Sequence, residues 1–143
     1  MSDYVLTDGD LANFLPIFGS AIVTVRPGIL MGGGKAKLLG KKQCVYGDEK
    51  KVMVPGCMYI SGSFSIPGAG TLMIQSLAPN QKAMKTKDCG RSVLLKGMMF
   101  TAKFQVMVPA MMPVPLAPPV PDPVPFYPGQ GNFITTNIKY KAT

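Results

Sequence analysis

The stretch Phe100-Thr101-Ala102-Lys103-Phe104-Gln105-Val106-Met107-Val108 places an apolar side chain at every second position. Successive side chains of a β-strand point to opposite faces, so this period of two predicts a strand with one buried face. Its aromatic and β-branched residues are also those that strands favour. The stretch is the clearest strand in the sequence, and it indicates a β-rich fold.

Shorter apolar runs on the N-terminal side of this strand are separated by turn residues. A β-branched run covers residues 21–25 and is closed by Pro27-Gly28. Residues 50–54 end at Pro55-Gly56 and residues 57–61 follow at once, which predicts a hairpin across that turn. Turn signals about eight to twelve residues apart are typical of a small all-β unit.

Two further turns are expected from glycine, proline and charge. Residues 65–70 (Ser-Ile-Pro-Gly-Ala-Gly) are interpreted as a turn before a strand over 71–77. Residues 79–87 are interpreted as a basic loop that leads to a strand over 92–95. The sequence therefore predicts strands joined by short connections.

Prolines crowd the segment from Pro109 to Pro128. Proline lacks a backbone N–H and favours the polyproline II conformation, so we expect an extended strap or connector that is not a central strand. Residues 132–140 then predict a final strand. Residues 1–20 are expected to form either one short helix or an extended arm.

The 143-residue length fits one domain, and 16 glycines with 14 prolines disfavour long helices. We therefore expect an all-β fold: a small cone-like domain of short strands and hairpins. Four segments are expected, namely an N-terminal arm (1–20), a β-rich core (21–108), a proline-rich strap (109–131) and a C-terminal strand (132–143).

No catalytic residue is predicted. The sequence has no histidine, which excludes Ser-His-Asp and Cys-His arrangements. None of the seven carboxylates forms a spaced pair suited to acid and base roles. Gly32-Gly33-Gly34-Lys35 lacks the spacing and the following Ser or Thr of a phosphate loop. We therefore predict that the chain is not an enzyme.

The net charge is +8, and thirteen of the fifteen basic residues are lysines without interleaved aromatics. Nucleic-acid readers use arginine forks and stacking aromatics, so a solvated basic face is favoured over nucleic-acid binding. Asp3, Asp8 and Asp10 give the N-terminus the wrong charge for a secretory signal peptide. No apolar run approaches the roughly 20 residues of a transmembrane helix, so we expect synthesis in the cytoplasm.

Cys44, Cys57 and Cys89 are separated by 13 and 32 residues and include no C-x-x-C pair. Three thiolates could supply three of the four ligands of a tetrahedral zinc site. Buried free thiols in a reduced compartment are the alternative that we favour, and one disulfide with one free thiol is a third.

The pattern over residues 20–108 resembles the PAAR-like proteins that form the spike tip of contractile injection systems, in type VI secretion and in phage-tail-like particles. The resemblance lies in short strands punctuated by residues 54–57 (Val-Pro-Gly-Cys), 66–70 (Ile-Pro-Gly-Ala-Gly) and 87–90 (Lys-Asp-Cys-Gly). The proline-rich strap and the last strand look like additions to that pattern.

This resemblance implies a structural function. Such a protein caps the β-helical spike trimer with one copy per trimer, sharpens it for piercing an envelope and can attach cargo. It would assemble into an injection particle, including extracellular ones, and touch the target membrane transiently. Family members often hold a metal through histidines and cysteine; without histidine, Cys44, Cys57 and Cys89 would have to hold the zinc or iron. The alternatives are another baseplate or adaptor protein and, with less support, a basic nucleic-acid-binding module.

Overall fold

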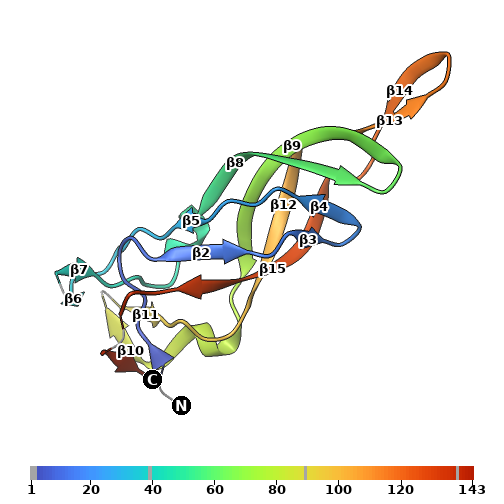
Figure 1. Cartoon of the computed structure of the whole chain (residues 1–143). Coiled ribbons are helices and arrows are strands. Elements are labelled where there is room, and N and C mark those ends of the chain that lie inside the picture. Colours follow the sequence, from blue (N-terminus) through green and yellow to red (C-terminus); the bar gives the residue numbers. More distant parts are fainter. Residues whose placement is uncertain (1–2, 39, 89, 138) are drawn as a thin grey trace.

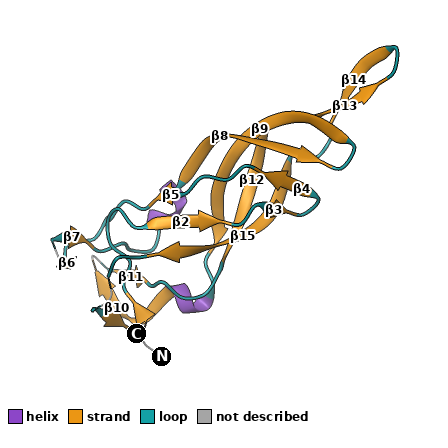
Figure 2. Cartoon of the chain, viewed as in Figure 1, coloured by secondary structure: helices purple, strands orange, loops and turns teal. Residues whose placement is uncertain are grey.

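The computed structural model describes residues 3–38, 40–88, 90–137 and 139–143. The molecule is elongated, with both chain ends at one extremity and a hairpin projecting at the other (Figure 1). The described residues form strands and two 3-10 helices, η1 (Asp48–Lys51) and η2 (Pro79–Gln81), and contain no α-helix (Figure 2). The all-β prediction is confirmed.

Ten strands form one antiparallel sheet, here called the blade. Eight of them follow the order β3-β4-β8-β9-β12-β15-β2-β5, while β13 pairs with β9 and β14 with β13. Their bounds are β2 Leu11–Phe14, β3 Ile17–Phe18, β4 Ala21–Val23, β5 Gly28–Ile29, β8 Met53–Ser61, β9 Phe64–Ser76, β12 Phe100–Val108, β13 Met111–Val114, β14 Ala117–Pro121 and β15 Phe126–Ile134. The sheet curls into a half-barrel, as the bent path of β9 shows (Figure 1).

Six strands at the extremity that holds both chain ends form three two-stranded antiparallel sheets, here called the base. The pairs are β1 (Asp3–Tyr4) with β16 (Lys141–Ala142), β6 (Lys37–Leu38) with β7 (Lys41–Lys42), and β10 (Lys82–Asp88) with β11 (Arg91–Leu94). A small apolar cluster of Val5, Ala83, Val93 and Leu95 lies in this part of the chain. The base thus has its own minor core.

Strand β12 has the bounds predicted from its alternation, and it lies between β9 and β15. Phe100, Ala102 and Phe104 on one face are each at most 1% exposed, while Thr101 on the other face is exposed. The strand predicted over 21–25 is also found, as β4. The prediction for β12 is confirmed because its periodicity follows burial directly, and the β-branched run over 21–25 forms a strand in its first three residues.

Aromatic rings fill the concave side of the blade. The ring centroid of Phe104 lies 5.1 Å from that of Tyr59 and 6.1 Å from that of Phe18. Gly70 gives Phe104 its space, because a Cβ built on Gly70 would come within 2.6 Å of the Phe104 ring. The glycine serves here as a site for a ring from the neighbouring strand, and any larger residue would displace that ring.

The predicted hairpin across Pro55-Gly56 is wrong. These residues lie inside the continuous strand β8, and the chain turns at Gly62-Ser63 to enter β9. Gly56 has a φ of 72°, and the register with β9 shifts between Val54 and Cys57. The pair therefore forms a β-bulge, in which an extra residue bends the strand without ending it.

The segments read as a turn over 65–70 and as a loop over 79–87 also lie largely in strands. Residues 65–70 belong to β9, where Gly68 and Gly70 let β12 and the chain after it come close. Residues 82–87 belong to β10, paired with β11 at Lys87 and Ser92. Exposed strands of the base have lysines on both faces. Their sequences therefore lack the alternation of apolar and polar residues from which a strand is predicted.

The proline-rich segment differs from the expected strap in two places, because residues 111–121 form the β13–β14 hairpin and its last residues lie inside the sheet. Residues 126–131 belong to β15, which lies between β12 and β2 inside the sheet. The Val106 N–H donates to the Pro125 carbonyl at 2.9 Å, so the alternating ladder points the nitrogen of Pro128 away from β12. The β2 ladder covers Gly131–Ile134, so Pro128 occupies a sheet position where no donor is needed.

The N-terminal arm is neither a helix nor free of the fold. It supplies β1 to the base, β2 and β3 to the blade, and the turn at Gly19 that joins β3 to β4. Phe14 and Phe18 of this segment are at most 2% exposed in the main core.

Candidate functional site

The β13–β14 hairpin projects beyond the rest of the blade at the extremity opposite the termini (Figure 1). It is attached to the sheet through the pairing of Met111 with Ile66 of β9. All five residues of β14 are exposed. This hairpin is the most prominent feature of the surface and the first candidate for a functional element.

The apex of the hairpin is conformationally unusual. Val114 pairs with Ala117, which leaves Pro115-Leu116 as a two-residue turn. Leu116 has a φ of 60° and is, apart from glycines, the one described residue with a positive φ. Its side chain is fully exposed. A left-handed conformation favours Gly or Asn, so the apex holds a large apolar side chain at a cost in strain.

A buried polar cluster fixes the root of the hairpin. Asp122 is 5% exposed and accepts hydrogen bonds from the hydroxyls of Tyr59 at 2.9 Å and Tyr127 at 2.5 Å. Its other oxygen accepts from the Val124 N–H at 3.0 Å. The Ala110 N–H in turn donates to the Tyr59 hydroxyl at 3.0 Å. One carboxylate thus joins strands β8 and β15 to the chain on both sides of the hairpin.

Both tyrosines of this cluster keep their protons through the neutral range. Burial raises the pKa of Tyr59 to about 12, and the neighbouring Asp122 carboxylate adds to the increase against the Ala110 hydrogen bond. Burial also raises the pKa of Tyr127, with the same carboxylate as the next cause. The two tyrosine hydroxyls therefore act at the root as hydrogen-bond donors to the Asp122 carboxylate.

Charge is strongly segregated between the two extremities. The ten strands of the blade contain Lys103 as their single charged residue. The six strands of the base contain eight basic residues, which are Lys37, Lys41, Lys42, Lys82, Lys85, Lys87, Arg91 and Lys141. The molecule thus has a basic end and an almost uncharged end.

All seven carboxylates serve as acceptors for backbone N–H groups. In the loops around the base, Asp48 accepts from Gly33 and Val45, each at 2.8 Å, and Asp8 accepts from Gly32 at 2.8 Å. The remaining acceptors are Asp3, Asp10, Glu49, Asp88 and Asp122. The second oxygen of Asp48 has no hydrogen-bond partner but lies 3.8 Å from Lys51 Nζ. These side chains hold the backbone of loops and turns in place by accepting hydrogen bonds from it.

Two of the three predicted metal ligands lie in the main core, and Cys89 lies outside the described residues. Burial, and next the Asp48 carboxylate, raise the pKa of the fully buried Cys44 thiol and disfavour a thiolate ligand. The Cys57 thiol lies 3.6 Å from the Val54 carbonyl, to which it donates. Both thiols are free, so no disulfide joins them. Within the described ranges no cluster of three or more metal-ligating side chains is found.

The three-cysteine metal site stays a prediction that elemental analysis tests directly. About one zinc or iron per chain, in protein purified without chelators, would support the site, and Cys44→Ser should then lower the metal content. Protein that contains neither metal would exclude the site. The surroundings of Cys44 oppose metal binding, because burial and the Asp48 carboxylate raise the pKa of its thiol and favour the protonated form.

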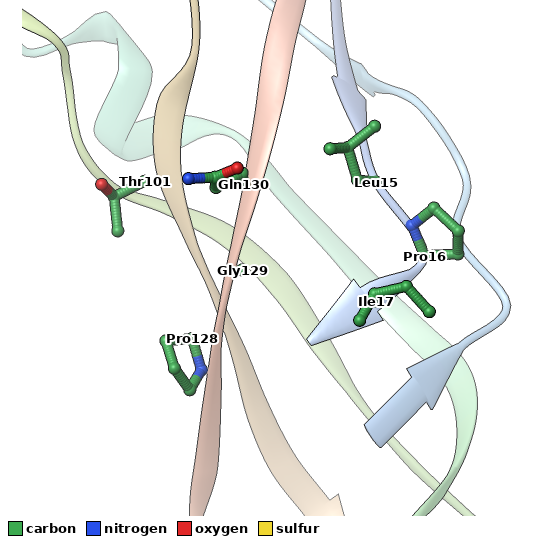
Figure 3. Close-up of a pocket in the computed structure, with 7 residues that line it drawn as sticks. All are labelled: Leu15, Pro16, Ile17, Thr101, Pro128, Gly129 and Gln130. Carbon is green, nitrogen blue, oxygen red and sulfur yellow. The ribbon is translucent and has the colours of Figure 1, made fainter. Parts of the chain in front are cut away.

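A shallow groove lies between the turn from β2 to β3 and strand β15. It has a volume of about 590 Å³, and Figure 3 shows the turn from β2 to β3 on one side and β15 with Thr101 of β12 on the other. Pro16 and Pro128 both line the groove, and neither has an N–H with which to donate a hydrogen bond. The Leu15 N–H donates to the Gln130 carbonyl at 2.9 Å beside this groove, and the described residues that line the groove include no acidic or basic side chain.

Geometry and chemistry together define a class of protein. The chain is all-β, its base is basic, and its blade strands carry Lys103 as their one charged residue. Its carboxylates accept hydrogen bonds from the backbone. Such a chain is suited to assembly and mechanical work. No described helix is long and apolar enough to cross a membrane.

Comparison with known families agrees with this class. The model of the contractile injection system spike tip protein family matches residues 1–143. The chain therefore belongs to the contractile injection system spike tip protein family. No curated protein matches the sequence closely.

Family membership confirms several predictions at a coarse level. The protein is a structural spike tip and not an enzyme, it is part of a contractile injection particle, and it associates with the spike of that system. Sequence reasoning identified this family but missed the hairpin, the Asp122 cluster and the separation of charge.

Proposed function

We propose that the protein caps the β-helical spike trimer, one copy per trimer, and gives it a sharp end that pierces the target envelope. Membership of the spike tip family carries this proposal. The elongated shape supports it, because the molecule has one broad extremity and one that narrows to a hairpin (Figure 1). Contraction of a surrounding sheath would supply the force, and cargo attachment remains a secondary role to be tested.

We place the base against the spike and the hairpin in the leading position. The base presents three two-stranded sheets whose edges are only partly bonded within the chain, as by the Thr143 carbonyl along β10, and this number of sheets suits the end of a trimer. Docking would cover these edges, which otherwise invite aggregation. The hairpin end offers no comparable edge, since three of the five residues of β14 are prolines.

Charge reversal on the base should weaken binding to the spike. Lys41 and Lys42 form β7 and are both exposed, so Lys41→Glu with Lys42→Glu should leave the core intact. We expect at least a tenfold loss of affinity for the spike trimer, about 1.4 kcal/mol or more, measured by cosedimentation. Lys103→Glu on the blade is the matched control and should bind as the unmodified chain does.

Stoichiometry separates this proposal from its rival. One chain per three spike chains supports the cap, whereas a higher copy number around a ring would indicate a baseplate or adaptor protein. Loss of binding on substitution in the hairpin, with none on substitution in β7, would reverse the orientation proposed for the molecule.

A further inference from the structure

The surface of the hairpin lacks hydrogen-bonding chemistry. From Pro109 to Pro121 the side chains are those of alanine, methionine, proline, valine and leucine, without one charged, hydroxyl or amide group. Protein interfaces carry about one hydrogen bond per 100–200 Å² and use polar side chains at their rims. A surface with no such side chain has little with which to recognise a folded protein partner.

The hairpin backbone is also poor in donors. Prolines occupy positions 113, 115, 118, 119 and 121, and none of them has an N–H. The Ala110 N–H at the root is bonded to the Tyr59 hydroxyl. Unsatisfied N–H and C=O groups both oppose the entry of an open strand edge into hydrocarbon, and these prolines remove the N–H part of that cost. They equally prevent the addition of a partner strand.

Leu116 provides a second, independent observation. A two-residue turn with Pro115 at its first position favours glycine at its second, and leucine there is strained and fully exposed. Strain at an exposed position points to a role outside folding, because neither packing nor hydrogen bonding of the chain repays it. An apolar apex is useful where the first surface that it meets is apolar.

We propose that the β13–β14 hairpin enters the hydrocarbon core of the target bilayer, with Leu116 leading. The inference rests on the proposed function, in which the hairpin is the leading end. The five residue-to-residue steps from Met111 to Leu116, at about 3.3 Å each, reach roughly 17 Å, which is about half of a hydrocarbon core of about 30 Å. The Asp122 cluster holds the root of the hairpin while its apex is under load.

Tryptophan fluorescence tests insertion directly, because the chain contains no tryptophan. Leu116→Trp keeps a large apolar residue at the apex, and Met84→Trp is the control, since Met84 is 89% exposed on β10 of the base. The probe is a vesicle of phosphatidylcholine, whose zero net charge avoids attraction of the basic base. We expect a blue shift and quenching by bromine-labelled acyl chains for Trp at 116, and neither for Trp at 84.

A polar apex should abolish insertion without unfolding the hairpin. Asn tolerates a positive φ, so Leu116→Asn should keep or raise Tm by up to roughly 2–4 °C while vesicle binding falls at least tenfold. Met84→Asn should leave vesicle binding unchanged. Equal quenching at both tryptophan positions, or no quenching at position 116, would overturn the inference.

The spike complex distinguishes this inference from the proposed function. If the Leu116→Asn protein still binds the spike at one copy per trimer but the apex never enters vesicles, the cap stands and insertion is wrong. If Leu116→Asn abolishes spike binding, the hairpin is a docking element, and both the insertion and the proposed orientation are wrong.

Discussion

Replacing Phe104 with alanine should lower the free energy of unfolding by about 4 kcal/mol, because the removed ring leaves a cavity in a rigid core. Phe104 is fully buried on β12 and contacts the rings of Tyr59 and Phe18. The facing Gly70 has no side chain that could move into the vacated space. Urea unfolding measured by tyrosine fluorescence or circular dichroism gives the change directly.

Phe126→Ala is the matched control for this experiment. Phe126 is the same residue type, pairs with Gln105 next to Phe104, and is 45% exposed. We expect a loss of about 1 kcal/mol or less, mainly from the contact of its ring with the Lys103 ammonium, 4.6 Å from the ring centroid. Equal losses at positions 104 and 126 would contradict the location of the core.

Removing the Asp122 side chain should have a comparable effect, with a loss of about 3–5 kcal/mol for Asp122→Ala. The substitution leaves the buried Tyr59 hydroxyl and the Val124 N–H without their acceptor, and leaves the Tyr127 hydroxyl with only Ser61 Oγ at 3.1 Å. The hairpin should open more readily than the rest of the chain unfolds, because the cluster lies at the root of the β13–β14 hairpin. Hydrogen exchange of the Met111 and Met112 amides, measured by NMR, should therefore accelerate markedly.

Asp122→Asn separates the loss of charge from the loss of the acceptor. The amide oxygen can still accept one tyrosine hydrogen bond, so this variant should lose about half as much stability as Asp122→Ala. A stability unchanged from that of the unmodified chain in Asp122→Ala would show that the cluster does not hold the hairpin.

Alternation in the sequence predicted the strands whose two faces meet different surroundings. In β12 the core lies on one face and solvent on the other, so Phe104 and Lys103 differ as the pattern requires. Strands of the base have no such contrast, because Lys85 and Lys87 of β10 face solvent in a two-stranded sheet. The alternation of apolar and polar residues therefore could not identify these segments as strands.

Glycine and proline misled the prediction where they act inside strands. Pro55-Gly56 makes a bulge, Gly70 makes space for a ring, and Pro128 occupies a position that faces an interrupted ladder. A turn and these arrangements require the same residue types, and they differ in long-range partners that a single sequence does not reveal.

The candidate site was partly visible before the structure. The absence of polar side chains between Pro109 and Pro121 could have indicated an apolar projection. The role of Asp122 could not be foreseen, because its partners Tyr59 and Tyr127 come from distant strands. Acidic residues near glycines, such as Asp48 with Gly33, could have been read as loop acceptors.

The separation of charge also has a consequence for how the particle is built. With its basic residues concentrated in the base and Lys103 as the one charge within the blade strands, the chain carries a large electric dipole moment along its length. In the field of an acidic surface such a molecule turns its base forward before contact, which raises the fraction of productive encounters. In the proposed orientation, attraction of the base to an acidic spike end would select the direction of mounting during diffusion, ahead of any specific contact.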